Sequence, residues 1–190
     1  MQYILIIISA VLVNNIVLAQ FLGICPFLGV SKKLSTAVGM GAAVLFVMTL
    51  ATIVTYLIQN YILVPLKIDF LQTVIYILVI AALVQMVELI LKKVSPALYQ
   101  ALGVFLPLIT TNCTILGVAI LVVRKDYNLM ESTVFAIANA IGFTLAIVIF
   151  SSIRERLELL DIPESMKGVP ISLIVAGLLA LAFMGFANIV

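Results

Sequence analysis

Two cysteines, Cys25 and Cys113, are the only thiols of this chain, and their surroundings match. Each opens the pattern Cys-x-x-Leu-Gly-Val, and the two copies lie 88 residues apart. Each also belongs to a long uncharged run that is followed by two adjacent cations, Lys32 with Lys33 and Arg124 with Lys125. A thiol that recurs with its surroundings indicates one kind of site built twice. Paired thiols are soft ligands, which suit a metal centre.

The composition places these thiols in a membrane. The 190 residues are 65% hydrophobic and 9% charged, with a mean hydropathy of +1.38, whereas soluble chains are about a quarter charged. The net charge of +2 gives no reason to expect a nucleic-acid partner. The chain has no histidine, which excludes histidine-ligated haem or zinc and a histidine general base.

Six uncharged runs can be distinguished, at 3–31, 37–58, 70–87, 97–123, 132–153 and 169–190. All but the third exceed the ~20 residues that span a bilayer, and the third reaches that length with its flanks. We therefore predict an all-α, polytopic membrane protein with six transmembrane helices in a single domain, 1–190. The start of the chain carries no basic side chain, so no cleaved signal peptide is expected.

The cysteines lie in the first and fourth runs, so the second half is expected to cross the membrane in the opposite sense. This arrangement is an inverted 3+3 repeat, with halves of about 1–93 and 94–190. Both cysteine-bearing runs would span about 40 Å as straight helices, against ~30 Å of hydrocarbon. We expect both to be discontinuous. In the first, Gly23 loosens the chain and Cys25 caps a helix that Pro26 begins; in the fourth, the break follows Pro107.

The cations between the runs predict the orientation. With the N-terminus outside, the cytoplasmic loops hold seven cations and the outer loops three, so the positive-inside rule favours two extracytoplasmic termini. The seven are Lys32, Lys33, Lys92, Lys93, Arg154, Arg156 and Lys167. The charged stretch from Arg154 to Glu158 is expected to cap a helix or to contact a soluble partner.

A thiolate in hydrocarbon is costly, at roughly 3 kcal/mol for a charge on insertion scales, and a bound metal offsets that cost. Iron–sulfur clusters usually take four thiolates, so two more would come from another chain or a second copy of this one. Two alternatives stay open at this point. The cysteines are small apolar fillers, or they form a disulfide.

Four asparagines lie in the uncharged runs, namely Asn14, Asn15, Asn112 and Asn139. Such groups either satisfy broken backbone and bond between helices, or they line an ion path or tune a metal centre. Glu88 precedes Lys92 by about one helical turn, which favours an ordinary interfacial pair over a proton carrier. Ser31 lies outside the expected ligand set, and its replacement by alanine is expected to be mild.

Residues 13–33, 101–113 and 153–157 resemble the membrane subunits of the Rnf and Nqr electron-transport complexes, specifically the A type of Rnf. The resemblance covers essentially the whole chain. It implies a six-helix protein paired with a homologous E subunit, in which two cysteines from each chain hold a [2Fe–2S] cluster midway through the membrane. Cys25 and Cys113 would be the ligands from this chain.

The same resemblance implies the function of the assembly. The complex, with further subunits B, C, D and G, passes electrons between ferredoxin and NAD while moving Na⁺ or H⁺ across the bacterial inner membrane. This chain would relay electrons and would not be catalytic alone. Two other classes remain as alternatives: a secondary transporter, since inverted repeats with broken helices are typical of transporters, and a purely structural anchor.

Overall fold

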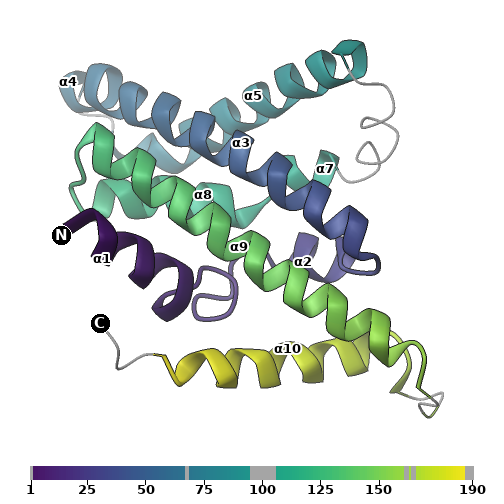
Figure 1. The fold of residues 1–190 in the computed structure, drawn as a ribbon. Coiled ribbons are helices and arrows are strands. Elements are labelled where there is room, and N and C mark those ends of the chain that lie inside the picture. Colours follow the sequence, from purple (N-terminus) through teal and green to yellow (C-terminus); the bar gives the residue numbers. More distant parts are fainter. Residues whose placement is uncertain (1, 67–68, 95–105, 161–162, 164–165, 187–190) are drawn as a thin grey trace.

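The computed structural model describes residues 2–66, 69–94, 106–160, 163 and 166–186, and in these ranges every regular element is helical (Figure 1). The first half contains α1 (Gln2–Ile8), the π-helix η1 (Ser9–Val13), α2 (Ile24–Val30), α3 (Leu34–Ile58), the π-helix η2 (Gln59–Leu63), α4 (Val64–Leu66), the 3-10 turn η3 (Asp69–Leu71) and α5 (Gln72–Val94). The second contains α7 (Leu106–Thr110), α8 (Cys113–Arg124), α9 (Leu129–Leu157) and α10 (Val169–Met184).

Four segments are long and apolar enough to cross a membrane, namely Leu34–Leu63, Gln72–Ile90, Pro107–Arg124 and Leu129–Leu157. Two shorter apolar helices, Tyr3–Val13 and Val169–Met184, correspond to the first and last of the six predicted runs. The prediction of an all-helical membrane protein is confirmed over the described residues. Part of the fourth run, 97–105, lies outside them.

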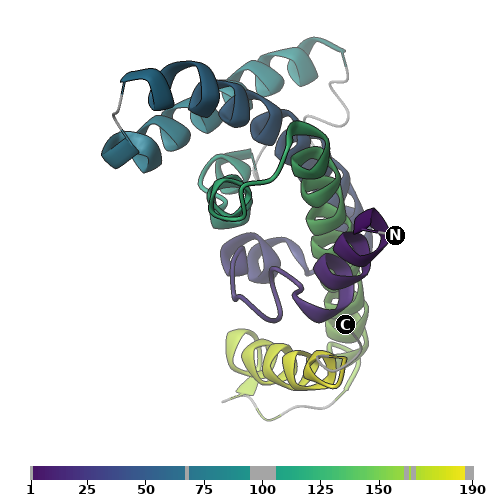
Figure 2. The same ribbon diagram turned by 90° about the vertical axis from the view of Figure 1, so that its left-hand side faces the viewer.

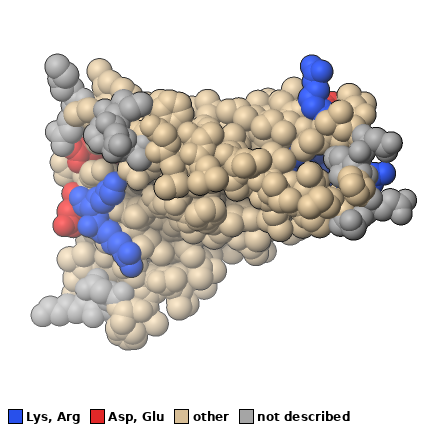
Figure 3. Space-filling model, turned by 90° about the horizontal axis from the view of Figure 1, so that it is seen from below, with Lys and Arg blue, Asp and Glu red and all other residues tan. Residues whose placement is uncertain are grey.

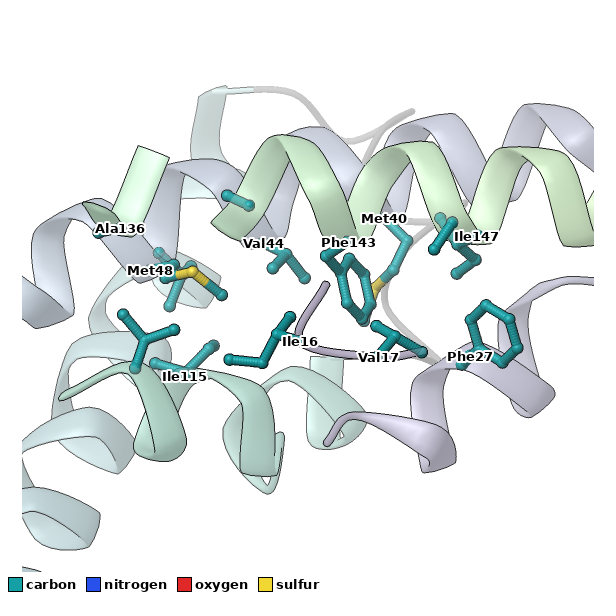
Figure 4. Close-up of a cluster of buried hydrophobic side chains, with 14 of the residues drawn as sticks. Ile16, Val17, Phe27, Met40, Val44, Met48, Ile115, Ala136, Phe143 and Ile147 are labelled. Atoms are coloured by element: carbon teal, nitrogen blue, oxygen red, sulfur yellow. The ribbon is translucent and has the colours of Figure 1, made fainter. Parts of the chain in front are cut away.

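The two longest helices, α3 and α9, lie side by side and run in opposite directions (Figure 1). Figure 2 shows α2 between the level of α8 and that of α10. The buried core fills the space between the long pair and the short helices (Figure 4). It joins Met40, Val44 and Met48 of α3 to Phe143 of α9 and Ile115 of α8.

Charged side chains gather toward the two ends of the molecule, and the belt between them is uncharged in the view of Figure 3. The starts of α3 and α10 and the ends of α5 and α9 all lie at one end of the molecule (Figure 1). The seven cations expected on the cytoplasmic side belong to these helix ends and the turns beside them. An uncharged belt with charged ends is the surface that a bilayer requires.

Candidate functional site

The first break separates η1 from α2 and occupies residues 14–23. The Asn14 N–H donates to the Ser9 carbonyl oxygen at 2.7 Å, which closes the π-helix, and its side-chain amide donates to Ser9 Oγ at 3.2 Å. Near its end the chain passes through left-handed conformations at Phe21 (φ 55°) and Gly23 (φ 79°). α2 then begins at Ile24.

Asn15 holds this irregular segment together and is fully buried. Its Nδ2 donates to the carbonyls of Val11 at 3.0 Å and of Gly142, on α9, at 2.9 Å. Its Oδ1 accepts from the backbone N–H groups of Val17 and Leu18 at 3.1 and 3.3 Å. The Oδ1 atom therefore satisfies two N–H groups that the break leaves open, and Nδ2 ties the break to α9.

The second break is short, because α7 ends at Thr110 and α8 begins at Cys113. Asn112 is the N-cap of α8, with an extended backbone and its Oδ1 accepting the Thr114 N–H at 3.0 Å. This geometry satisfies one of the donors that a helix start leaves open. A break after Pro107, predicted from the sequence, is confirmed.

The two breaks meet. The Gly23 N–H donates to Cys113 Sγ at 2.9 Å, across 90 residues of sequence. A Cβ on Gly23 would overlap Thr114 Oγ1 and stand 3.2 Å from Asn112 Oδ1. Only glycine fits this position, since it needs both a positive φ and the space that a side chain would take. The backbone of the first break is thus in contact with the thiol of the second.

The repeated motifs also pack on each other's halves. A Cβ on Gly117 would stand 2.6 Å from Leu22 Cδ1, in the first break, and one on Gly29 would stand 3.5 Å from Leu108 Cδ1, on α7. Each Leu-Gly-Val copy therefore lies against the segment that precedes the other cysteine. Both glycines therefore allow the two halves to approach closely.

Both thiols are free, and they stand at the beginnings of helices. Cys113 is the first residue of α8 and is partly buried, whereas Cys25 is the second residue of α2 and is exposed. The expectation that Cys25 caps α2 is wrong. Gly23 is the N-cap, and Pro26 is the third residue of the helix rather than the first. The left-handed conformation at Gly23, which glycine adopts without a steric penalty, sets the start of the helix earlier than expected.

Two buried polar atoms beside Cys113, Asn112 Nδ2 and Thr114 Oγ1, have no hydrogen-bond partner in the described part of the chain. Within the described ranges, no three side chains of the metal-ligating types His, Cys, Asp and Glu cluster together. The described residues therefore offer two thiols as soft ligands, with hydrogen-bond donors beside one of them. Two soft thiols suit iron–sulfur chemistry, and they make half of the usual four-thiolate set.

The far end of α2 is held by α9. Arg154 donates through one guanidinium nitrogen to the Leu28 carbonyl at 2.9 Å and to Ser31 Oγ at 2.7 Å. Phe27 stacks on Phe150 with ring centroids 4.3 Å apart. Of the two roles expected for the charged stretch from Arg154 to Glu158, Arg154 has the first, because it caps the end of α2. Ser31 is fully buried in this contact, so its replacement by alanine removes an Arg154 acceptor and is not a neutral control.

Two further residues that the sequence singled out, Asn139 and Glu88, lie on α9 and α5. Asn139 is buried on α9, and its Nδ2 donates to the Phe135 carbonyl of its own helix at 2.8 Å. Glu88 lies near the end of α5, one turn before Lys92. The sequence interpretation missed three contributors to the site: the Gly23 N–H, the Thr114 hydroxyl and the Arg154 contact with α2. The position of Thr114 directly after Cys113 was the one available signal.

The architecture defines a class: a polytopic helical membrane protein with two interrupted helices whose cysteine-bearing ends meet. The family model described as "Rnf-Nqr subunit, membrane protein" matches residues 3–190, and the chain belongs to this family.

Similar proteins match over nearly their whole length. The A-type subunit of the ion-translocating oxidoreductase complex of Syntrophotalea carbinolica is 60% identical over 98% of this chain and 96% of its own. The A-type subunit of the Na(+)-translocating ferredoxin:NAD(+) oxidoreductase complex of Acetobacterium woodii is 59% identical over 99% and 98%. The A-type subunit of the ion-translocating oxidoreductase complex of Vibrio cholerae is 52% identical over 100% and 98%.

Proposed function

We propose that this chain is the A-type subunit of an ion-translocating ferredoxin:NAD oxidoreductase complex in the bacterial cytoplasmic membrane. It relays electrons across the bilayer through an iron–sulfur cluster shared with a homologous subunit. The observation that carries the proposal is the 2.9 Å contact between the Gly23 N–H and Cys113 Sγ, which brings the two cysteine-bearing breaks together. The names of relatives at 52–60% identity support the membership in such a complex.

Cys25 and Cys113 are the ligands that this chain would contribute. A bound cluster supplies one-electron transfer at a depth where neither ferredoxin nor a nucleotide can reach. The exposure of Cys25 supports a shared site, because a thiol at the surface of this chain is open to a partner. The partner subunit would contribute the other two thiolates of the four.

The order of elements supports an inverted repeat. In each half, a break precedes a short helix that carries the cysteine, and a long helix and a further apolar helix follow. These helices are α2, α3 and α5 in the first half and α8, α9 and α10 in the second. The opposite directions of α3 and α9 agree with this relation. We assign both termini to the outside on the cation count. A reporter that functions only in the cytoplasm should be inactive when fused to the C-terminus, and an active fusion would overturn the orientation.

The alternative of a secondary transporter has less support. The breaks at 14–23 and 111–112 carry no charged side chain. Both ends of the Asn15 amide are engaged with backbone, so the most deeply buried polar side chain of the first break is not free to bind a solute. A solute site in a transporter is usually formed by such break residues.

Metal analysis of the whole complex tests the proposal. The complex is purified with all its subunits, and iron, acid-labile sulfide and the EPR spectrum of the dithionite-reduced sample are measured before and after removal of the soluble subunits. We expect an iron–sulfur signal to remain with the membrane subunits. Membrane subunits that hold no iron above the background would overturn the cluster assignment and leave the family membership intact.

A further inference from the structure

Two hydrogen-bond donors beside Cys113 have no hydrogen-bond partner among the residues that the structure describes. Asn112 is 3% exposed and Thr114 is 0% exposed, and neither Asn112 Nδ2 nor Thr114 Oγ1 has a partner. Buried polar atoms in folded proteins are nearly always hydrogen-bonded, so an unpaired one calls for a partner that the isolated chain lacks. Two such atoms on either side of one cysteine indicate a ligand at that cysteine.

The chemistry of the free atoms is that of donors. Asn112 already uses its Oδ1 to accept the Thr114 N–H, which leaves its NH₂ group to donate. The Thr114 hydroxyl makes no intrahelical bond, unlike those of Thr52 and Thr144, which donate to the carbonyls four residues before them. The Gly23 N–H donates to Cys113 Sγ. Gly23 is also close to the side chains of Thr114 and Asn112, because a Cβ on Gly23 would meet Thr114 Oγ1 and Asn112 Oδ1.

The other cysteine has no comparable surroundings. The Thr111 N–H occupies the position that matches Gly23 in the repeat, but it donates to the Pro107 carbonyl at 3.1 Å. Among the described residues, no donor comparable to the Gly23 N–H reaches the Cys25 thiol. The two thiols of the site therefore differ in hydrogen bonding as well as in exposure.

We propose that the Thr114 hydroxyl and the Asn112 side-chain amide donate hydrogen bonds to the sulfurs around Cys113 when the iron–sulfur cluster is bound, and that they raise its midpoint potential. The inference rests on the proposed function. Reduction adds a negative charge to the cluster, and hydrogen bonds to its sulfurs stabilise that charge. The low dielectric of the surroundings strengthens each bond.

The test compares Thr114→Val with Thr114→Ser in the purified complex, by EPR-monitored redox titration. Valine removes the hydroxyl at nearly constant size, and serine keeps it. We expect the reduced-to-oxidised ratio at the wild-type midpoint to fall about tenfold in Thr114→Val, equivalent to about 59 mV for a one-electron couple. Thr114→Ser should stay near the wild type. Thr52→Val, which removes an equally buried but intrahelically bonded hydroxyl, is the matched control and should not shift the potential.

A second variant tests the amide. Asn112→Ser keeps an N-cap oxygen for α8 and removes the Nδ2 donor. Asn112→Ser should also lower the midpoint potential of the cluster. If the complex does not assemble with Thr114→Val, Asn112→Ser is the variant that tests the inference. A further readout is pulsed EPR after exchange into D₂O, where Thr114→Val should lose the coupling of one exchangeable deuteron.

The outcomes separate the inference from the proposed function. A wild-type complex without the cluster overturns both. A wild-type cluster whose potential is unchanged in Thr114→Val and in Asn112→Ser overturns this inference alone, and buried water is then the partner of the two groups. A fall in potential in Thr52→Val equal to that in Thr114→Val also overturns it, because the effect would then be general to the fold.

Discussion

The two helix breaks carry the same cysteine motif but are built differently. The first runs through residues 14–23, with two left-handed residues and a buried asparagine that bonds to α9. The second consists of 111–112, where one asparagine cap starts the next helix. Through the Gly23 N–H, the long break contacts the partly buried thiol of Cys113, the residue that directly follows the short break.

The difference teaches that two copies of one sequence motif can place a cysteine at the same point of a helix although the backbone that precedes it differs. Both cysteines stand in the first turn of a helix, yet one is exposed and the other partly buried. The Cys113 thiol is thus partly enclosed by this chain, and the Cys25 thiol is exposed. The following predictions test that division, beginning with the largest effect.

Replacing either thiol should abolish the centre. In Cys25→Ser and Cys113→Ser the soft thiolate is lost at nearly constant size, and we expect the intramembrane iron signal and the ferredoxin-linked NAD reduction to fall to background. Both variants should still insert into the membrane, as measured by immunoblot of the membrane fraction. Ser152→Ala is the control, since Ser152 is exposed and bonds only to its own helix. Normal iron and EPR signals in either cysteine variant would show that the thiols are not ligands.

Gly23→Ala should separate the breaks. Alanine at a positive φ costs about 1–2 kcal/mol, and its Cβ would also overlap Thr114 Oγ1. We expect most of the iron to be lost, as measured by iron content per complex. Gly29→Ala is the matched comparison, because its Cβ would make an ordinary 3.5 Å contact with Leu108. Equal iron content in the two variants would contradict the close contact at Gly23.

Asn15→Ala should destabilise the protein more than Asn112→Ala does. The first change leaves the buried N–H groups of Val17 and Leu18 without their acceptor, at a cost of about 1–3 kcal/mol for each unsatisfied group. The second removes one helix cap, at about 1 kcal/mol. The apparent unfolding temperature of the complex in detergent measures both. A larger fall in the unfolding temperature in Asn112→Ala than in Asn15→Ala would contradict the greater structural role of Asn15.

Arg154→Ala should have the smallest effect and a local one. It removes the two hydrogen bonds to the end of α2, so the amides of 24–30 should exchange with deuterium several-fold faster by mass spectrometry. Arg154→Lys keeps the charge and should show a smaller increase. Arg156→Ala removes a charge from an exposed position on the same helix end and should leave the exchange of α2 unchanged.

Much of the architecture could be predicted from residue types and spacing. Runs of apolar residues locate the apolar helices, although the described residues contain four that are long enough to span a membrane and two shorter ones rather than six full spans. The excess length of the runs that contain Cys25 and Cys113 indicates that these helices are interrupted. The length of the first break could not be predicted, because it depends on the bonds of Asn15 to Gly142, a residue 127 positions away. The contact of Arg154 with Ser31 could not be predicted for the same reason, since 123 residues separate them.

The position of Cys25 in its helix shows the limit of local rules. Proline favours the first helical position and polar residues favour the cap, so a helix begun by Pro26 was a reasonable expectation. Gly23 overrides that preference because its left-handed backbone allows α2 to begin at Ile24. Its neighbours across the interface, Thr114 and Asn112, come from the other half of the chain, and one sequence does not reveal which residues face it.

The helix α9 contacts the first break and the helix that follows it at three levels: Gly142 at Asn15, Phe150 at Phe27 and Arg154 at the end of α2. At 1.5 Å per residue, the outer two of these points on α9 are about 18 Å apart. A tilt of α9 by about 5° would displace one of them relative to the other by about 1.6 Å, by the same geometry. Because two of the three contacts are with α2 itself, a tilt of α9 would be expected to move α2 and, with it, the thiol of Cys25.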